Sequence, residues 1–215
     1  MYCPCCDTES PAFLSFGVHP RPNARCPQCG ALERHRLLRL FLRASSRLQE
    51  GARLLHIAPE PVLRRMFKAT PSIRYIEADL HPARGVRLDI TALPLADASV
   101  DAIVCNHVLE HVPDDCQAMR ECRRVLKPRG WAILQSPVDR SRDTTFEDPS
   151  VVDPAEREAL FGQFDHLRVY GRDYGNRLEA AGFSVDEVDV VQALPPGQAQ
   201  LYGVRSEPIY VCRPA

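Results

Sequence analysis

The sequence lacks any apolar run that could cross a bilayer, since no stretch approaches the ~18 apolar residues required. Its start, Met-Tyr-Cys-Pro-Cys-Cys, has neither the basic nor the apolar region of a secretory signal. An excess of charge of one sign is also missing, because 27 basic and 28 acidic side chains leave a formal net charge of −1. These absences predict a cytoplasmic protein with no membrane partner. They also exclude nucleic-acid binding by overall charge.

Internal repeats and low-complexity tracts are absent as well. Hydrophobic residues make up 45% of the chain and charged residues 26%, which is close to the globular average and excludes bulk disorder. The 215 residues suit one domain of ordinary size with a small appendage.

Cysteine, in contrast, is abundant, and five of the nine cysteines lie in the first 29 residues. Cys3/Cys6 and Cys26/Cys29 form two C-x-x-C turns with nineteen residues between them, and Cys5 is left over. This spacing predicts a structural zinc site of four thiolates. An odd cysteine count in a reducing compartment argues against a disulfide framework. Free surface thiols and a redox C-x-x-C pair are the alternatives.

Apolar residues at helical spacing predict a helix over 32–48, which Glu50-Gly51 ends. We therefore expect an N-terminal zinc-ribbon module with its connecting helix over residues 1–50. Another face of this helix carries a row of arginines, Arg36, Arg39, Arg43 and Arg47. The module holds seven arginines and four acids, a formal charge of +3, and a zinc–thiolate centre lowers this to about +1. The arginine face is expected to be solvated or paired with acids rather than bound to RNA phosphates.

From residue 51 onward, short apolar strands alternate with helices. We expect strands at 54–57, 73–77, 86–88, 101–105, 131–135, 183–190 and 209–212. Helices are expected near 62–68, after the capping Asp114, at 154–161 and at 173–181. This alternation predicts an α/β domain over 51–215 with a doubly wound, mostly parallel seven-stranded sheet. The polar segment 139–172 is expected to form a lid that binds substrate.

The most specific pattern surrounds the fourth strand. It runs from Asp101 to Cys105, continues as Asn106-His-Val-Leu-Glu-His111, and ends with Arg-Val-Leu-Lys-Pro-Arg-Gly130 before the fifth strand. This combination resembles the class I S-adenosylmethionine-dependent methyltransferases of the methyltransferase type 11 kind. Ala-Gly-Phe at 181–183 also matches. The resemblance spans 51–212 and implies a Rossmann-like fold and S-adenosylmethionine as cofactor, and the cysteine module resembles zinc-ribbon extensions of some such enzymes.

The resemblance also implies cofactor residues. Asp79, at the end of the second strand, matches the acid that accepts hydrogen bonds from the ribose. Asp89, after the third strand, matches the residue that binds the adenine amine, and Asn106 and His107 would border the sulfonium. The physical expectation agrees, because ligands of doubly wound sheets bind at the carboxyl ends of the strands near the switch point.

The first loop departs from the family pattern. That pattern is acidic-x-Gly-x-Gly-x-Gly, whereas this chain has His56-Ile-Ala58-Pro-Glu60-Pro-Val62. All three glycines are missing, and His56 stands where the acid belongs. We expect Ala58 to be small enough for close approach of the ligand. Glu60 is expected to supply a carboxylate to the methionine ammonium, and the missing glycines disfavour a dinucleotide site.

His107-Val-Leu-Glu110-His111 also fits the inverted zincin pattern H-x-x-E-H. That chemistry needs both histidines on one face of a helix. Here the motif follows a strand directly and Pro113 cuts it off, so we expect no full helix and interpret the match as accidental. His111 is then a packing residue.

In the 139–172 segment, His166 is the candidate general base because histidine titrates near neutrality. Arg168 is a candidate for holding an acidic substrate. An ordinary surface loop with ion pairs is an equally open interpretation of both residues.

The leading hypothesis is a cytoplasmic S-adenosylmethionine-dependent methyltransferase that acts on O or N of a small molecule or glycan, with a structural zinc ion. One alternative is an RNA base methyltransferase whose ribbon clamps RNA, although nucleic acid is the less favoured partner. The other is a non-catalytic binding or scaffold protein with a degenerate cofactor loop.

Overall fold

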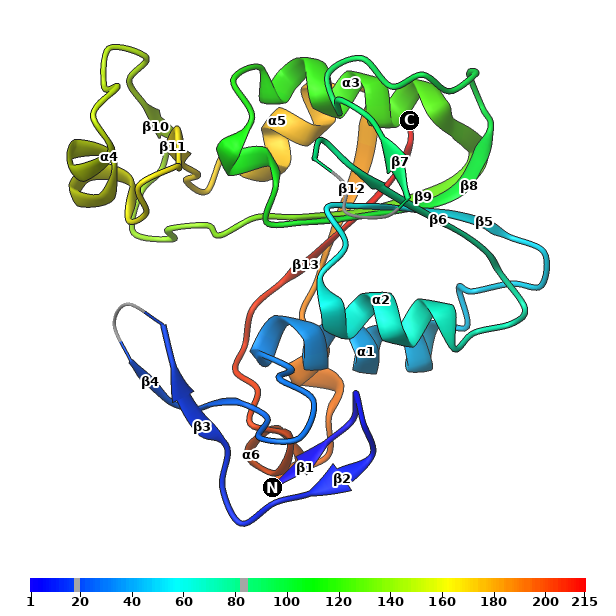
Figure 1. The fold of residues 1–215 in the computed structure, drawn as a ribbon, viewed down its shortest axis with the longest axis vertical. Helices are drawn as coiled ribbons and strands as arrows, with labels where there is room; N and C mark the ends of the chain where they lie inside the picture. Colours follow the sequence, from blue (N-terminus) through cyan, green and yellow to red (C-terminus); the bar gives the residue numbers. More distant parts are fainter. Residues whose placement is uncertain (18–19, 82–84) are drawn as a thin grey trace. The chain divides into compact units, whose positions relative to one another are not determined.

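The structure is a computed structural model, which describes residues 1–17, 20–81 and 85–215 (Figure 1). Its contacts divide the chain into two compact units. The cysteine unit comprises Met1–Gly51, Glu60–Arg74 and Val188–Ile209, and the sheet unit comprises Ala52–Pro59, Tyr75–Glu187 and Tyr210–Ala215. Within the described ranges, none of the helices has both the length and the apolar composition needed to span a bilayer.

The sheet unit is built on a seven-stranded sheet with the order β12-β13-β9-β8-β5-β6-β7. The strands are β5 (Arg53–Ile57), β6 (Arg74–Asp79), β7 (Val86–Arg87), β8 (Val100–Asn106), β9 (Leu126–Gln135), β12 (Phe183–Val188) and β13 (Ile209–Pro214). The pairs β5/β8, β8/β9 and β6/β7 are parallel, whereas β13 runs antiparallel to β9. The predicted doubly wound, mostly parallel α/β sheet is therefore confirmed.

The strand order reverses beside β5. The chain places β6 on one side of β5 and β8 on the other. A reversal of this kind opens a crevice at the carboxyl ends of the strands. Both β5 and β8 are almost entirely buried, as expected of central parallel strands rich in branched apolar residues.

Two helices, α3 (Asp115–Val125) and α5 (Tyr174–Ala180), lie over one face of this sheet (Figure 1). α3 begins at Asp114 as expected, because its carboxylate accepts a hydrogen bond from the Gln117 amide at 2.8 Å. The buried face of α3 consists of Ala118, Met119, Cys122 and Val125. α5 is joined to the sheet by Tyr174, whose hydroxyl donates to the Leu134 carbonyl at 2.9 Å.

The turn from α3 into β9 is tighter than the sequence predicted. We expected a stop over 127–130 and a strand from 131, but β9 already begins at Leu126, opposite Val100. A side-chain carbon on Gly130 would lie 2.9 Å from the Asp101 carbonyl oxygen and 2.7 Å from Leu126. Glycine is therefore needed here for the close approach of the two strands.

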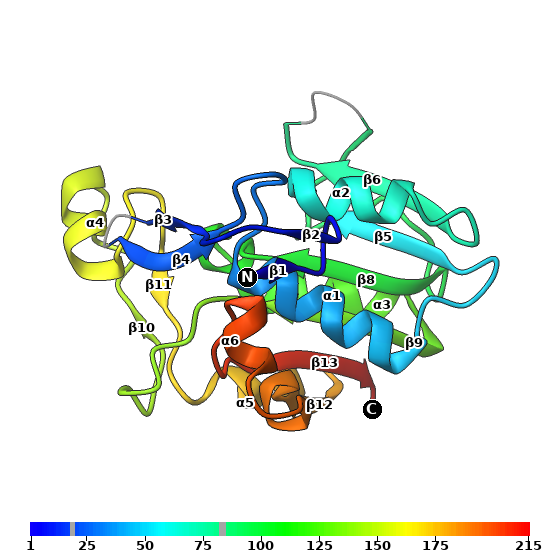
Figure 2. The same ribbon diagram turned by 90° about the horizontal axis from the view of Figure 1, so that it is seen from below.

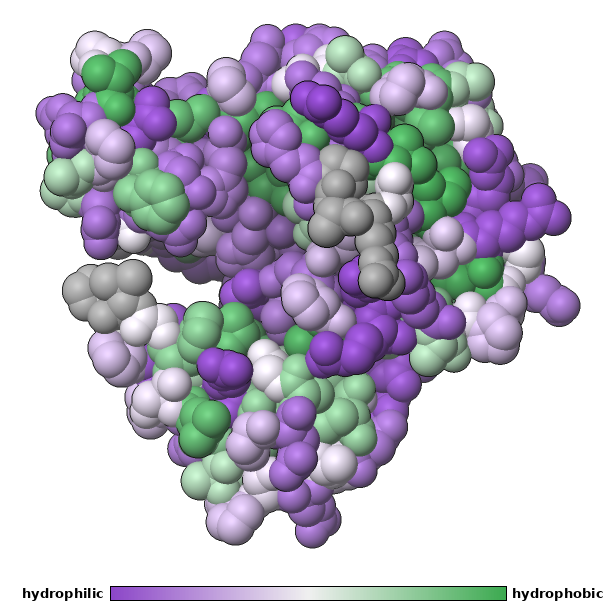
Figure 3. Space-filling view, in the orientation of Figure 1, coloured by the Kyte–Doolittle hydropathy of each residue, from purple (hydrophilic) through white to green (hydrophobic). Residues whose placement is uncertain are grey.

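The segment 139–172 contains α4 (Pro154–Phe161), as predicted, and the antiparallel pair β10 (Phe146–Glu147) and β11 (Arg168–Val169). These elements lie together at the upper left of Figure 1. Figure 3 shows apolar surface interspersed with polar surface over them. The exposed apolar residues include Val152, Leu160 and Phe164.

The cysteine unit begins with two small antiparallel hairpins, β1 (Tyr2–Cys3) with β2 (Thr8–Glu9) and β3 (Leu14–Phe16) with β4 (Arg21–Arg25). Its helices are α1 (Glu33–Ser45), α2 (Pro61–Lys68), η2 (Val190–Ala193) and α6 (Gln198–Tyr202) (Figure 2). The hairpins could not be predicted from sequence, because strands of two to five residues are too short to show periodicity.

The arginine row of α1 binds the loops of its own unit. Arg36 is fully buried, and its guanidinium donates to four backbone carbonyls. The acceptors are Ala24 at 2.9 Å, Ala31 at 2.6 Å, Asn23 at 3.4 Å and Gly203 at 2.7 Å. Arg39 donates to the Pro4 carbonyl, and Arg43 pairs with Asp7 at 2.8 Å. These three arginines therefore hold the cysteine loops against the helix.

Candidate functional site

The carboxyl ends of four neighbouring strands border a cavity of about 910 Å³ in the sheet unit. Each strand delivers one of the predicted cofactor residues to its lining. Ala58 follows β5, Asp79 ends β6, Asp89 follows β7, and His107 follows β8. Further polar residues in the lining are His81, Thr91, His111, Asp114, Gln117 and Asp165.

Two of these residues have a left-handed backbone. Ala58 has a φ of 47° and His107 a φ of 54°. This conformation costs a non-glycine residue about 1–2 kcal/mol, and glycine adopts it freely. The Ala58 amide donates to the Ala78 carbonyl of β6 at 2.8 Å, which holds the loop in place. The first loop thus takes up a glycine-type turn at Ala58 although the glycines are missing.

Asp79 and Asp89 each use one carboxylate oxygen to brace the loop that follows. Oδ1 of Asp79 accepts from the His81 amide at 3.0 Å. Oδ1 of Asp89 accepts from both the hydroxyl and the amide of Thr91, and these bonds lower the pKa of Asp89. Each carboxylate retains Oδ2 for a ligand.

The cavity is acidic. Its described lining residues include four aspartates, Asp79, Asp89, Asp114 and Asp165, and neither lysine nor arginine. Burial of an anion next to unpaired carboxylates is unfavourable, whereas a cation is attracted to them. The described lining thus suits a cationic or neutral ligand better than a phosphate ester.

His56 and Asn106 lie under the loops and do not line the cavity. His56 is fully buried at the end of β5, and its Nδ1 lies 2.8 Å from the Tyr75 hydroxyl. Asn106 is 4% exposed at the end of β8. Their contact with a cofactor stays a prediction.

The H-x-x-E-H motif lies on a single 3-10 turn, η1 (Leu109–His111), which confirms that no full helix carries it. Glu110 is 1% exposed, and its Oε2 accepts from the Ser136 hydroxyl at 2.9 Å. Its Oε1 lies 3.3 Å from Nδ1 of His107. Burial raises the pKa of Glu110, but contact with His107 outweighs this and the pKa is lowered overall.

His166, the candidate base, packs against His111 rather than lining the cavity itself. The two rings meet edge to face with their centroids 4.7 Å apart. Nδ1 of His166 lies 3.1 Å from the Phe161 carbonyl, and burial lowers the pKa of His166. His111 does line the cavity, and its Nδ1 lies 3.3 Å from Oδ2 of Asp165.

Arg168, the candidate for holding an acidic substrate, is not among the described lining residues of the cavity and forms ion pairs instead, which is the other interpretation left open by the sequence. It is 4% exposed, and Nε pairs with Glu147 at 2.8 Å. Its guanidinium also donates to three backbone carbonyls around η1, those of Leu109, Val112 and Pro113. Arg168 therefore fastens the 139–172 segment to the η1 turn. The sequence could not show this, because the acceptors lie more than fifty positions away.

Glu60 belongs to the cysteine unit. Its Oε1 lies 2.5 Å from Nη2 of Arg34 and 2.8 Å from Nε2 of His35. Burial raises the pKa of the Glu60 carboxyl, but these two α1 residues outweigh it and hold the pKa well below its usual range. The carboxylate predicted to bind the methionine ammonium thus has an arginine and a histidine of α1 as partners.

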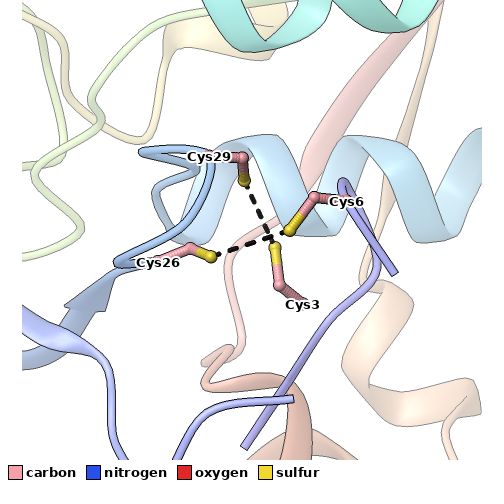
Figure 4. Close-up of side chains that lie close together, drawn as sticks. All are labelled: Cys3, Cys6, Cys26 and Cys29. Atoms are coloured by element: carbon pink, nitrogen blue, oxygen red, sulfur yellow. Dashed lines mark hydrogen bonds between the residues drawn. The ribbon is translucent and has the colours of Figure 1, made fainter. Parts of the chain in front are cut away.

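The four predicted metal ligands lie together in the cysteine unit (Figure 4). The Sγ atoms of Cys3 and Cys29 are 3.6 Å apart, those of Cys6 and Cys26 are 3.8 Å apart, and all four lie within 4.8 Å of one another. A tetrahedral site with Zn–S bonds of about 2.3 Å has sulfur–sulfur distances of about 3.8 Å. The cluster therefore has the size that a zinc ion requires, and Cys5 lies outside it.

The sequence analysis did not single out Thr91, Gln117 and Asp165, and it interpreted Glu110 and His111 as an accidental match. A signal was present for four of these five residues, because Thr91, Glu110 and His111 come after strands and Asp165 lies in the segment expected to form a lid, whereas Gln117 lies inside α3. What sequence spacing could not show is which of them meet.

Comparison with known proteins supports this geometry. Residues 46–134 match the model of a family described as "Methyltransferase domain". A Mycolicibacterium smegmatis protein named "Probable S-adenosylmethionine-dependent methyltransferase" is 34% identical over 110 residues, which cover 49% of this chain and 38% of that protein. The chain spans about a third of the length of the first curated relatives it matches.

Two solved structures share the fold. An S-adenosylmethionine-dependent methyltransferase from Mesorhizobium loti matches with a TM-score of 0.51 and 18% identity, over 80% of this chain and 94% of that one. The [4+2]-cyclase SpnF matches with a TM-score of 0.53 and 19% identity, over 86% and 83%. The second shows that this fold also carries other chemistry, so the activity has to be argued from the site.

Proposed function

We propose that the chain is an S-adenosylmethionine-dependent methyltransferase, and the match of residues 46–134 to the methyltransferase domain model supports this. Its acceptor would be an oxygen or nitrogen atom of a small molecule or glycan. The acidic cavity at the switch point of the sheet is the observation that carries this proposal.

The residues of the cavity fit the cofactor. S-adenosylmethionine supplies the methyl group from a sulfonium cation and carries no phosphate. Asp79 would accept hydrogen bonds from the ribose hydroxyls and Asp89 from the adenine amine, each through the oxygen not used in the loop. His107 would border the sulfonium. The first loop lacks glycine, but Ala58 adopts the left-handed backbone conformation that glycine would favour there. This conformation supports cofactor binding at the loop.

The charge of the same cavity indicates which kind of acceptor molecule it would bind. Four aspartates and no described lysine or arginine in its lining favour a neutral or cationic acceptor over a phosphate-bearing one. An RNA substrate is less favoured, because the arginines that could bind its phosphates already have partners. Arg36 and Arg39 donate to carbonyls of their own unit, and Arg43 pairs with Asp7. A small-molecule or glycan acceptor is therefore the proposal.

General base catalysis by His166 stays a proposal from the sequence. An acceptor hydroxyl or amine must lose a proton, and a neutral imidazole can take it up. His166 packs against His111, and of these two rings His111 is the one that lines the cavity. His166 would therefore act next to the cavity lining.

For the cysteine unit we propose a structural zinc ion bound by Cys3, Cys6, Cys26 and Cys29. The sulfur–sulfur distances support it, and four thiolates leave no position open for catalysis. A cytoplasmic location agrees with nine free cysteines, since a reducing compartment keeps thiols reduced.

Calorimetric titration of the zinc-replete chain with S-adenosylhomocysteine tests the cofactor proposal. We expect one site per chain with a Kd in the micromolar range, about −8 kcal/mol. Asp79→Asn should weaken binding at least about tenfold, since it exchanges a charged acceptor for a neutral one. Asp143→Asn is the matched control, because Asp143 is exposed and its ion-pair partner among the described residues is Arg172.

Absence of heat and of a thermal shift at millimolar ligand would overturn the proposal. The alternative of a non-catalytic binding or scaffold protein would then be preferred. If the Asp79 variant and the wild type bound S-adenosylhomocysteine with equal affinity, the proposed hydrogen bonds from the ribose hydroxyls to Asp79 would be contradicted.

A further inference from the structure

The η1 turn and the 139–172 segment bring three metal-ligating side chains together in the sheet unit. Glu110, His111 and His166 each offer one ligand atom, and these atoms lie within 4.8 Å of one another. We propose that they form a second metal site, which binds a divalent transition-metal ion. The proposal goes beyond methyl transfer and does not rest on it.

Both imidazoles are oriented as metal ligands usually are. Nδ1 of His166 faces the Phe161 carbonyl at 3.1 Å, and Nδ1 of His111 faces the carbonyl and carboxylate oxygens of Asp165 at 3.3 Å. An acceptor at Nδ1 fixes the tautomer that keeps the proton there. Each ring is therefore left with Nε2 and its lone pair for a metal.

Glu110 provides the anionic ligand. It is 1% exposed, and while Oε2 accepts from Ser136, Oε1 has no hydrogen-bond partner among the described residues. A buried carboxylate oxygen without such a partner is costly. A bound cation would satisfy it.

Arg168 is the cationic residue nearest in sequence to this cluster, and it already has other partners. Arg168 donates to the Leu109 carbonyl next to Glu110, but its charge is paired with Glu147 at 2.8 Å and lies 4.0 Å from Asp115. His107 approaches Oε1 of Glu110 at 3.3 Å without forming a hydrogen bond. Neither residue therefore supplies the missing bond to Oε1.

The ligand set indicates which ions fit. Two imidazoles and one carboxylate suit Zn²⁺, Fe²⁺, Mn²⁺ or Co²⁺ better than Ca²⁺ or Mg²⁺, which prefer oxygen ligands. Three protein ligands also leave coordination positions for water or another oxygen donor. His111 lines the cavity, so the ion would border the space proposed for the acceptor.

A metal on Nε2 of His166 excludes that atom as a proton acceptor. The ligand role and the base role of His166 therefore make opposite predictions for metal content. This difference decides between them without an activity assay.

The test uses the full chain and two probes. Zinc-replete protein is dialysed against Zn²⁺ and its metal content is measured, with about two ions per chain expected, one in each unit. Mn²⁺ is titrated into a separate sample that carries only one zinc ion per chain, so that the second site is empty, and its binding is followed by electron paramagnetic resonance. Because Mn²⁺ prefers oxygen and nitrogen ligands to thiolates, it reports on the second site alone.

His166→Asn and His111→Gln should each remove about one zinc ion per chain and abolish Mn²⁺ binding. His81→Asn is the matched control, since His81 lines the same cavity without belonging to the cluster, and it should keep both. Circular dichroism of each variant checks that the fold is retained. Because two different histidines are tested, a folding defect in one leaves the other informative.

One zinc ion per chain in the wild type, unchanged in both variants, would overturn the metal site and leave His166 free to act as a base. Mn²⁺ binding that survives in both variants would overturn it too. Titration of the same samples with S-adenosylhomocysteine separates the two proposals, because cofactor binding without a second metal contradicts only this one.

Discussion

At Ala58 a methyl group sits on a backbone that favours glycine, with a φ of 47° at the edge of the cavity. We predict that Ala58→Val lowers the free energy of unfolding by about 2 kcal/mol, because a β-branched side chain fits this conformation poorly. The added bulk should also weaken S-adenosylhomocysteine binding at least about tenfold. Chemical denaturation and calorimetry measure the two effects.

The matched control is Ala98→Val. Ala98 has nearly the same φ, 48°, but is exposed and does not line the cavity. The Ala98→Val variant should lose a similar amount of stability but keep its affinity for S-adenosylhomocysteine. Unchanged affinity in the Ala58 variant would mean that this loop does not contact the cofactor.

The Glu60 carboxylate gives the cysteine unit a pH dependence. Its pKa is depressed in the folded state, so its stabilising contribution is complete above the unfolded pKa of about 4.3 and is lost as the pH falls below that value. We predict that Glu60→Gln lowers stability by about 2 kcal/mol at neutral pH. The difference from wild type should shrink when thermal unfolding is measured at progressively lower pH.

Glu33→Gln serves as the comparison, since Glu33 pairs with Arg21, whose side chain is 45% exposed. A largely solvated pair contributes little, so this variant should differ from wild type by less than about 0.5 kcal/mol. If the loss of stability in Glu60→Gln did not change with pH, the packing of the side chain rather than its charge would be responsible.

At the scale of elements, the close approach of β9 to β8 depends on Gly130. We predict that Gly130→Ala costs about 2 kcal/mol, because its Cβ would overlap the Asp101 carbonyl and Leu126 and force the strands apart. Gly175→Ala, within α5, should instead be neutral or stabilise by about 0.5 kcal/mol, since its nearest neighbour atom would lie 3.6 Å away. Urea denaturation of both variants measures this, and equal effects would contradict the steric argument.

The elements that could be predicted from sequence are those with local signals. α4 begins and ends at the predicted residues, since Asp153 caps it and Gly162 ends it. β9 was predicted five residues too late, because its start is set by pairing with β8 rather than by its own residues. The hairpins of the first 25 residues were missed because such short strands carry no period.

At the scale of the whole molecule, the candidate site was predictable only in part. The positions Ala58, Asp79, Asp89 and His107 follow from strand order, because parallel strands bring their ends to one edge. The meeting of His111 with His166, 55 positions later, depends on how the segment 139–172 folds back, and spacing carries no information on that.

The division of the chain into units can be tested through the metal. We predict that zinc chelation raises hydrogen exchange in residues 1–51 together with 60–74 and 188–209, because these segments form one compact unit. The sheet unit should stay protected. Mass-resolved hydrogen exchange with and without chelator measures this.

Loss of protection confined to residues 1–50 would favour the boundary expected from sequence. That boundary stays a prediction until this experiment, because shared contacts do not reveal which segments fold together.

The bond from Arg36 to the Gly203 carbonyl joins residues 167 positions apart. The four cysteines proposed as zinc ligands are synthesised long before Gly203. We therefore expect the growing chain to be able to bind the metal before the unit around the cysteines is complete. A chain shortened before residue 203 would retain the thiols and lose one of the four carbonyls that accept from the guanidinium. The segment around Gly203 would then complete the surroundings of a metal centre that had already formed.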